Sequence, residues 1–428
     1  MQPSKKSHYA PKTRTPSGHS VPQYQSVAVP KSLENCLTIL PSLTAPAFGG
    51  YFICDLKNKN IEIHNLSLSF TATSILNGLS YAGSGSPAPA ERPYFVPIFQ
   101  WIERVEICVN NQIIDTLYGQ DMFIKNQLFY NDKARLANNN AAGNYANVAQ
   151  RQQKSTTQSE WILNLHTFCN EASYSVLTNS NEIQLRVFMN TIDGLYTIPN
   201  LVSGGSGPAY TGSPSVSLSC AVVSEEVNLS KSGLAVSRLN TLRNTPTTQL
   251  FHDTRYFLTN IQPTNSARII LTSITGSVAF LYFLVQTNNG KGDNSYKFSP
   301  IQSFALYSAS NQNIVGGQTI SDTNNRKLLS QWSQSSYINE WAGGSNLVGQ
   351  TTDNGASVYF WSFSADPISA ISNGQALGSY WFQGQEVLEV NFTPDFAGGS
   401  ASAQIQVFAS TEQMLNVSAT NVSKIALQ

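Results

Sequence analysis

Segments from the first half of the chain recur in the second half, in the same order and roughly 200 residues later. They comprise two alternating strands, a polar turn, a helix start at an aspartate, and an aromatic strand. The pairs are 65–71 with 268–274, 110–114 with 311–315, Asp121 with Asp322, 161–168 with 358–364, and 181–188 with 385–392. One match between alternating strands carries little weight, but a shared order and a shared offset indicate an internal duplication. The chain is therefore predicted to contain two copies of one unit.

Each copy is predicted to be a β-sandwich. Apolar and polar residues alternate along 61–70, 102–109, 182–188 and 386–392, and a period of two is typical of strands with one buried face. Stretches rich in Gly, Ser, Pro and Asn between the strands indicate long surface loops. Two segments, 119–131 and 321–341, break the alternation and are predicted to form short helices. The fold class is all-β, with two tandem eight-stranded jelly-roll β-sandwiches, short helices and long loops.

Composition suggests where these units begin and end. Residues 1–32 are predicted to form a basic arm, disordered or extended, because they contain no acid and little that could be buried. The basic side chains of this arm are Lys5, Lys6, Lys12, Arg14 and Lys31. The polar stretch 224–230, with the adjacent Glu225 and Glu226, reads as a solvated junction. We therefore expect the first jelly roll over 33–228 and the second over 229–428.

Charge is scarce throughout the chain. Only 12% of residues are charged, and 25 basic side chains balance 25 acidic ones, so no strong field attracts nucleic acid. A surface with few charges and no net charge favours association between copies. The cysteines lie in apolar stretches without a C-x-x-C pair, which indicates buried free thiols; they are Cys36, Cys54, Cys108, Cys169 and Cys220. No apolar run reaches the length of a membrane span or a signal peptide, so synthesis in the cytoplasm is expected.

One segment, 101–115, resembles a known family. It reads as a strand, a tight turn and a continuation that leads into a predicted helix. The turn and its continuation include Asn110, Asn111, Gln112, Ile114 and Asp115. This pattern resembles the G-G-Q-x-I-D region of the double jelly-roll major capsid proteins, the lineage of tailless membrane-containing phages, adenoviruses, virophages and large eukaryotic DNA viruses. Asn replaces both glycines here, and because Asn also tolerates positive φ, the turn is expected to persist.

The resemblance covers nearly all of the chain after the arm and implies a structural protein of the virion. Three chains would form a homotrimer, and its six jelly rolls would make a pseudo-hexagonal capsomer of an icosahedral capsid. The long loops would face outward. The basic arm would face inward, toward an internal lipid membrane, a minor capsid or penton protein, or a neighbouring capsomer. Such a protein is made in the host cytoplasm, is located in the capsid shell, and makes no sequence-specific contact with nucleic acid.

The sequence contains no P-loop, dinucleotide-binding, zinc-protease or nucleophile-elbow motif. The histidines are isolated from acids except for His252, which precedes Asp253, and we interpret His252 as a structural residue at the domain junction. We therefore expect no cofactor, no metal and no enzymatic activity. Two alternatives remain open. A carbohydrate-binding or host-attachment (spike-like) β-sandwich protein could stack sugars on Tyr380 and Trp381, and a polysaccharide hydrolase would need two carboxylates that converge in a cleft.

Overall fold

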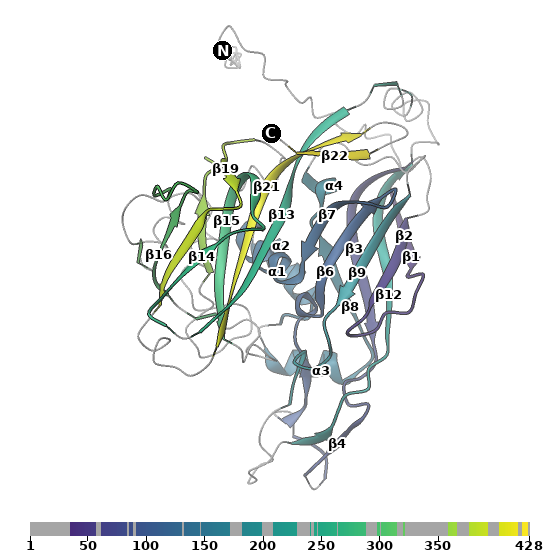
Figure 1. Ribbon diagram of the computed structural model, residues 1–428. Helices are drawn as coiled ribbons and strands as arrows, with labels where there is room; N and C mark the ends of the chain where they lie inside the picture. Colours follow the sequence, from purple (N-terminus) through teal and green to yellow (C-terminus); the bar gives the residue numbers. More distant parts are fainter. Residues whose placement is uncertain are drawn as a thin grey trace, which may run out of the picture.

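Figure 1 shows the computed structural model of the chain, in which two groups of strands stand side by side. The structure describes residues 35–56, 61–83, 85–88, 91–130, 132–145, 147–171, 182–198, 209–228, 240, 244–245, 247–262, 264–287, 298–299, 301–314, 320–321, 358–365, 376–392, 402–417 and 422–426. The basic residues of the predicted arm lie outside these ranges: Lys5, Lys6, Lys12, Arg14 and Lys31. Residues 322–341, where most of the second helix is predicted, also lie outside them.

The first group of strands is a sandwich of two four-stranded antiparallel sheets. One sheet has the order β1 (Asn35–Pro41), β12 (Leu218–Asn228), β3 (Ile61–Ala72) and β8 (Ser159–Leu165). The other has the order β2 (Tyr51–Leu56), β9 (Ile183–Met189), β6 (Ile102–Val109) and β7 (Gln112–Tyr118). Successive strands cross between the sheets except at the β6–β7 hairpin, which is the jelly-roll arrangement. An edge-to-face contact between Phe52 and Phe70, with ring centroids 5.8 Å apart, joins the two inner faces.

The second group of strands repeats this arrangement. One sheet has the order β13 (Thr247–Ile261), β21 (Ala403–Val417), β15 (Thr275–Thr287) and β18 (Val358–Ser362), with β19 (Tyr380–Gln383) paired to β15 and β22 (Val422–Ala426) paired to β21. The other has the order β14 (Ser266–Ile270), β20 (Val387–Phe392), β16 (Ile301–Tyr307) and β17 (Ile320–Ser321). Taken in chain order, the strands occupy the same positions as in the first sandwich. The predicted fold class of two tandem jelly rolls is confirmed.

The topology corrects one pair of the predicted repeat. Strand β3, which contains 65–71, occupies the position that β15 holds in the second sandwich. Residues 268–274, the predicted counterpart of 65–71, belong to β14 and the turn after it. That pairing is wrong because β15 is buried on both faces and lacks the alternation by which β3 was matched. Among the other pairs, the turn after β6 corresponds to the turn after β16, β8 corresponds to β18, and β9 corresponds to β20.

The polar stretch after residue 223 also differs from its prediction. Strand β12 continues to Asn228, so Glu225 and Glu226 belong to a sheet and not to a solvated junction. Asn65 donates a hydrogen bond to Glu225 at 2.6 Å, and Thr38 donates one to the buried Glu226 at 3.0 Å. The neighbouring strands therefore hold these carboxylates in place. With β12 ending at Asn228 and β13 beginning at Thr247, we propose the boundary between the jelly rolls at 228–229.

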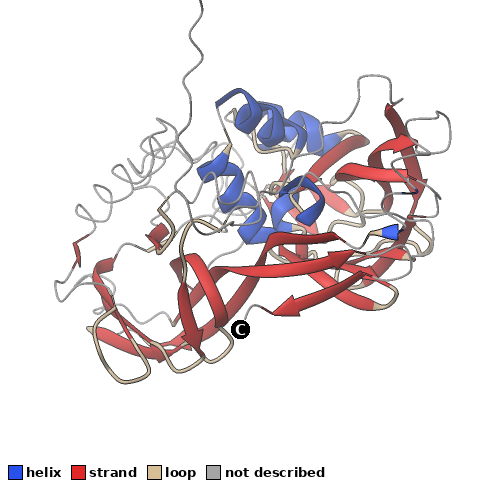
Figure 2. Cartoon of the chain, turned by 90° about the horizontal axis from the view of Figure 1, so that it is seen from above, coloured by secondary structure: helices blue, strands red, loops and turns tan. Residues whose placement is uncertain are grey.

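Helices gather in one region beside the strands, as Figure 2 shows. The connection from β7 to β8 contains α1 (Gly119–Phe129), α2 (Asp132–Ala141) and α3 (Val148–Thr156). A short α4 (Phe168–Glu171) follows β8, and a 3-10 helix, η2 (Ile98–Gln100), precedes β6. The helix predicted over 119–131 is confirmed as α1. Within the described ranges, no helix combines the length and apolar character needed to cross a membrane.

Hydrophobic cores fill both sandwiches, and the first core extends into the junction between them. Strand β15 contributes to both cores, since successive side chains on a strand point to opposite faces. Leu281 and Phe283 belong to the core of the second sandwich. Phe280 and Tyr282 belong to the core that includes the first sandwich. One face of the second sandwich is therefore packed directly against the first.

Close packing at the end of α2 gives a test of the first core. Gly143 has a φ of 76°, and a methyl group built there would lie 1.8 Å from the ring of Trp161. Trp161 is buried and packs on Trp101, with ring centroids 4.9 Å apart. The ring has no room to move away.

We expect Gly143→Ala to lower the free energy of unfolding by about 2–4 kcal/mol, because alanine adds a backbone cost at positive φ and overlaps the Trp161 ring. Urea unfolding followed by tryptophan fluorescence measures the change. Gly85→Ala is the matched control, since Gly85 has a φ of 86° but no atom lies within 4 Å of the added methyl group. The control should lose only about 1–2 kcal/mol, and equal losses in both variants would contradict this account.

Candidate functional site

The family-like turn joins β6 to β7. Asn110 and Asn111 have φ values of 49° and 65°, so both occupy the left-handed region that a two-residue hairpin turn requires. The Asn110 side chain accepts a hydrogen bond from the Glu182 amide at 3.0 Å. The Arg186 guanidinium donates to Asn111 Oδ1 at 3.1 Å. The two asparagines adopt the backbone conformation of the turn, and their side chains also bond it to Glu182 and to Arg186 of β9. Glycine could adopt the same conformation but has no side chain to make these bonds.

The second sandwich repeats part of this turn. Asn311, after β16, has a φ of 62°, and Arg268 donates a hydrogen bond to its Oδ1 at 3.0 Å. An asparagine at positive φ that accepts a hydrogen bond from an arginine of the same sheet thus occurs in the turn after β6 and in the turn after β16. The two arginines lie on strands that are not equivalent, β9 and β14. This local match supports the duplication independently of strand order.

The remaining residues of the family-like motif connect the first sandwich to other elements. Gln112 is exposed, whereas Ile114 and Asp115 are buried. The Asp115 carboxylate accepts a hydrogen bond from the Phe168 amide at the start of α4, at 3.2 Å. The Ile114 carbonyl accepts one from Lys424 of β22, at 3.3 Å. The motif therefore supports the junction between the sandwiches.

A buried polar cluster crosses this junction. Asp121 of α1 is fully buried and forms an ion pair with Lys125, one helical turn later, at 3.1 Å. Thr254 of β13 bonds to both side chains: its hydroxyl donates to Asp121 Oδ2 at 3.1 Å and accepts from Lys125 Nζ at 2.9 Å. Burial raises the pKa of the Asp121 carboxyl, and the Lys125 ammonium opposes that rise. The first sandwich supplies the charges, and the second supplies the hydroxyl that binds them.

A second group of contacts crosses the junction nearby. Lys424 of the second sandwich donates a hydrogen bond to the Ile114 carbonyl of the first. Asp253, also of the second sandwich, holds the Lys424 ammonium there through an ion pair at 2.5 Å, and His252 beside it is buried in β13. Four aromatic rings lie in sequence at the same junction, with neighbouring centroids 4.7, 4.9 and 5.3 Å apart; they are Tyr118 of the first sandwich and Tyr256, Phe408 and Tyr282 of the second. Burial raises the pKa of Tyr118 and of Tyr256. Polar and aromatic contacts together hold one sandwich against the other.

A distal extension lies at one end of the first sandwich, at the bottom of Figure 1. Two long connections meet there, 73–101 and 190–217. Their short strands pair as β4 (Leu79–Tyr81) with β11 (Tyr210–Gly212) and as β5 (Tyr94–Phe95) with β10 (Tyr196–Thr197). Tyr81 donates a hydrogen bond to the buried Glu91 at 2.6 Å, and this bond raises the pKa of Tyr81. The described residues of this end therefore pair with one another, and we propose that the extension faces outward.

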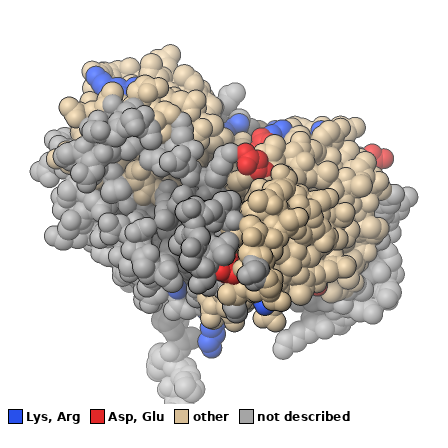
Figure 3. Space-filling model, turned by 90° about the horizontal axis from the view of Figure 1, so that it is seen from below, with Lys and Arg blue, Asp and Glu red and all other residues tan. Residues whose placement is uncertain are grey.

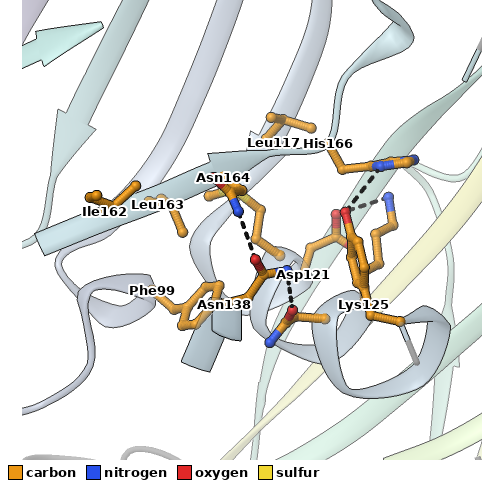
Figure 4. A pocket seen from close by; sticks show the side chains of 12 residues that line it. Phe99, Leu117, Asp121, Lys125, Asn138, Ile162, Leu163, Asn164 and His166 are labelled. Carbon is orange, nitrogen blue, oxygen red and sulfur yellow. Dashed lines mark hydrogen bonds and ion pairs between the residues drawn. The ribbon is translucent and has the colours of Figure 1, made fainter. Parts of the chain in front are cut away.

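A small cavity lies between α1, α2 and β8, and Figure 4 shows its lining. Asparagine side chains relay hydrogen bonds along it: Asn164 donates to Asn138 at 2.6 Å, and Asn138 donates to Asn126 at 2.9 Å. On the other side of the cavity, the Tyr130 hydroxyl and His166 Nδ1 lie 3.3 Å apart. The cavity measures about 20 Å³, which suits a single water molecule and excludes a substrate.

The described surface offers little charge and no metal-binding cluster. Figure 3 shows one face, on which charged side chains form only small, separated spots. Across the described ranges, no group of three or more His, Cys, Asp or Glu residues could hold a metal ion. Large apolar side chains are exposed on two edge strands: Leu37 and Ile39 on β1, at 68% and 62%, and Tyr51 on β2, at 61%. These edges are candidates for contacts with other protein copies.

The junction cluster predicts a characteristic pattern of variant stabilities. Asp121→Ala leaves Lys125 buried without its counter-charge and should lower the free energy of unfolding by about 3–5 kcal/mol. The double variant Asp121→Leu, Lys125→Met removes both charges. Its free energy of unfolding should fall clearly less than that of Asp121→Ala. Urea unfolding of the three proteins measures this difference. A double variant as unstable as Asp121→Ala would show that the cluster contributes through specific hydrogen bonds more than through charge pairing.

Comparison with known proteins identifies the fold. The sequence matches no family model and no curated protein sequence. Solved structures do match: VP54 of PBCV-1, fitted into a cryo-EM reconstruction of the virophage Sputnik, is 13% identical with a TM-score of 0.65, covering 94% of this chain and 98% of that one. The Faustovirus major capsid protein is 10% identical with a TM-score of 0.63, covering 95% and 93%. The mavirus major capsid protein is 12% identical with a TM-score of 0.52, covering 99% and 97%.

These similarities extend over nearly the whole chain and nearly the whole of each matched structure, so they include both sandwiches and the junction between them. The strand orders in the two sandwiches give the same answer independently. This chain therefore has the double jelly-roll fold of the major capsid proteins of icosahedral DNA viruses.

Proposed function

We propose that this chain is the major capsid protein of an icosahedral DNA virus and that three copies form a pseudo-hexagonal homotrimeric capsomer. The observation that carries the proposal is the match of both jelly rolls, in order and over almost the full length, to the Faustovirus and mavirus major capsid proteins. The match covers the two jelly rolls as a pair, and a capsomer of this kind is built from such pairs.

The geometry of the chain suits a tile of six sandwiches. The two sandwiches stand side by side in Figure 1, joined through a buried sheet face and a buried polar cluster. Three such rigid pairs around an axis supply six similar units, which is what a pseudo-hexagonal outline requires. The exposed apolar side chains on edge strands β1 and β2 and the scarcity of surface charge favour contacts between copies.

The remaining parts of the proposal concern partners and location. We infer that the chain resides in the capsid shell, after synthesis in the host cytoplasm, and has no enzymatic role. The arm over 1–32 would lie on the inner side, where its basic residues suit an anionic lipid surface, a minor capsid or penton protein, or a neighbouring capsomer. The distal extension of the first sandwich would face outward.

A second candidate is a carbohydrate-binding or host-attachment protein. Trp381 favours it, because its side chain is 46% exposed on β19, next to Tyr380. Exposed aromatic rings can stack on sugars. Binding on a glycan array that is lost in Trp381→Ala, in a protein that is monomeric, would support this candidate over the capsid subunit.

The capsomer proposal predicts a specific mass in solution. Purified full-length protein should scatter light as a particle of three times the chain mass. A variant that lacks residues 1–32 should give the corresponding trimer, because the jelly rolls and their edges remain intact. Multi-angle light scattering after size exclusion measures both, and a monomer in both samples would contradict the proposal.

The arm predicts a separate, charge-dependent behaviour. The trimer should bind vesicles of phosphatidylcholine and phosphatidylserine in a flotation assay, and binding should fall as salt rises. A matched variant replaces Lys5, Lys6, Lys12, Arg14 and Lys31 with Gln and keeps the arm's length. It should remain trimeric and lose vesicle binding. Equal binding by both proteins would assign membrane contact to another surface.

A further inference from the structure

Two buried cysteines face each other across the first sandwich. Cys54 lies on β2 and Cys220 on β12, so the two belong to opposite sheets. Both side chains are buried and contribute to the same hydrophobic core. Facing sheets in a sandwich are typically about 10 Å apart, which is too far for a disulfide. A bond between these residues therefore requires that the sheets converge at this point.

Such a convergence occurs at the corner between β1 and β2. The Ser42 amide donates a hydrogen bond to the Cys220 carbonyl at 2.9 Å. The next amide, that of Leu43, donates to the carbonyl of Ile53, the residue before Cys54, at 2.8 Å. Because the Cα atoms of neighbouring residues are about 3.8 Å apart, these two bonds hold the backbones of β12 and β2 close together. The chain crosses from one sheet to the other beside the two cysteines.

Both side chains point into the core beside this corner. Burial raises the pKa of the Cys220 thiol, and a hydrogen bond with the neighbouring Cys54 thiol raises it further. Both cysteines are free thiols in this structure. Two buried thiols on backbones that the corner holds together are placed for a cross-link between the sheets.

We propose that Cys54 and Cys220 are a disulfide-forming pair that cross-links the two sheets of the first jelly roll when the protein meets a low-molecular-weight disulfide such as oxidised glutathione. This inference does not depend on the proposed function. The bond would close a loop of roughly 170 residues, and constraining so long a loop in the unfolded chain stabilises the folded state.

The reaction is two successive thiol–disulfide exchanges. The Cys220 thiolate, the more exposed of the two, attacks one sulfur of oxidised glutathione; a mixed disulfide forms and one glutathione leaves. The Cys54 thiolate then attacks the Cys220 sulfur, the Cys54–Cys220 bond forms and the second glutathione leaves. The two cysteines lose two electrons to the glutathione disulfide, and their two protons are balanced by those on the released thiols.

Burial makes this exchange slow in the folded protein. The raised pKa of Cys220 leaves little thiolate at neutral pH, and the core limits access by the oxidant. The rate should therefore rise in mildly alkaline buffer. It should rise further when the full-length protein refolds in the presence of the oxidant, because both thiols are accessible to it before the core forms.

The experiment maps disulfides in the full-length protein after refolding with oxidised glutathione. Mass spectrometry of a non-reduced digest should show one peptide pair that joins residues 54 and 220 and disappears on reduction. Cys36→Ser, Cys108→Ser and Cys169→Ser variants are matched controls and should keep this cross-link. Cys54→Ala and Cys220→Ala should lose it, and the cysteine that remains should carry glutathione.

A second readout separates a native bond from an incidental one. The oxidised wild type should unfold at a temperature on the order of 5 °C higher than the reduced protein. In Cys54→Ala the same treatment should cause no such shift. Full alkylation of all thiols after oxidative refolding, a cross-link between other cysteines, or a fall in the unfolding temperature on oxidation would each overturn the proposal. The refolding step ensures that a negative result does not arise from a lack of oxidant access.

Discussion

The structure depends on a sheet that is buried on both faces. In β15, side chains on one face fill the core of the second sandwich, and side chains on the other face join the core of the first. If the sheet that contains β15 were buried on one face only, the second jelly roll would be an independent unit, connected to the first only by the polypeptide. Because the outer face of β15 presents Phe280, Tyr282 and Leu284, that sheet can exclude water only against the first sandwich. The pair of jelly rolls is therefore one body joined by a hydrophobic interface.

Polar contacts determine how the two sandwiches are oriented at that interface. Apolar packing is non-directional and tolerates sliding, whereas buried charges are costly unless their partners are in place. The Thr254 hydroxyl bonds to both Asp121 and Lys125 only when β13 lies in its observed position against α1. Lys424 likewise reaches both Asp253 and the Ile114 carbonyl only in this arrangement. We infer that the hydrophobic face supplies the attraction and the polar cluster selects one orientation.

How much of each strand is buried determines whether the sequence predicts it, and burial at this interface hides one of the central strands. Half-buried strands such as β9 and β20 are visible as alternation, and the Asn110–Asn111 turn is visible as a local pattern. Strand β15 is missed, because burial of both faces removes the alternation and makes it one apolar run. The end of β12 is missed for the opposite reason: its glutamates read as solvated until Thr38 and Asn65 from other strands are seen to bind them. Contacts between residues more than a hundred positions apart, such as Thr254 with Asp121, leave no local signal.

Duplication accounts for the two similar sandwiches of the chain, which would supply two of the six units in the proposed capsomer. Two copies begin as equivalents, as the shared strand order and the asparagine–arginine contact at both turns still indicate. Within the described ranges, the first copy carries helices α1–α3 and the distal extension. In the proposed trimer, three such chains would supply six similar units around one axis. The buried junction would fix the relative position of the two units within each chain, so that all six could meet their neighbours in a near-hexagonal arrangement.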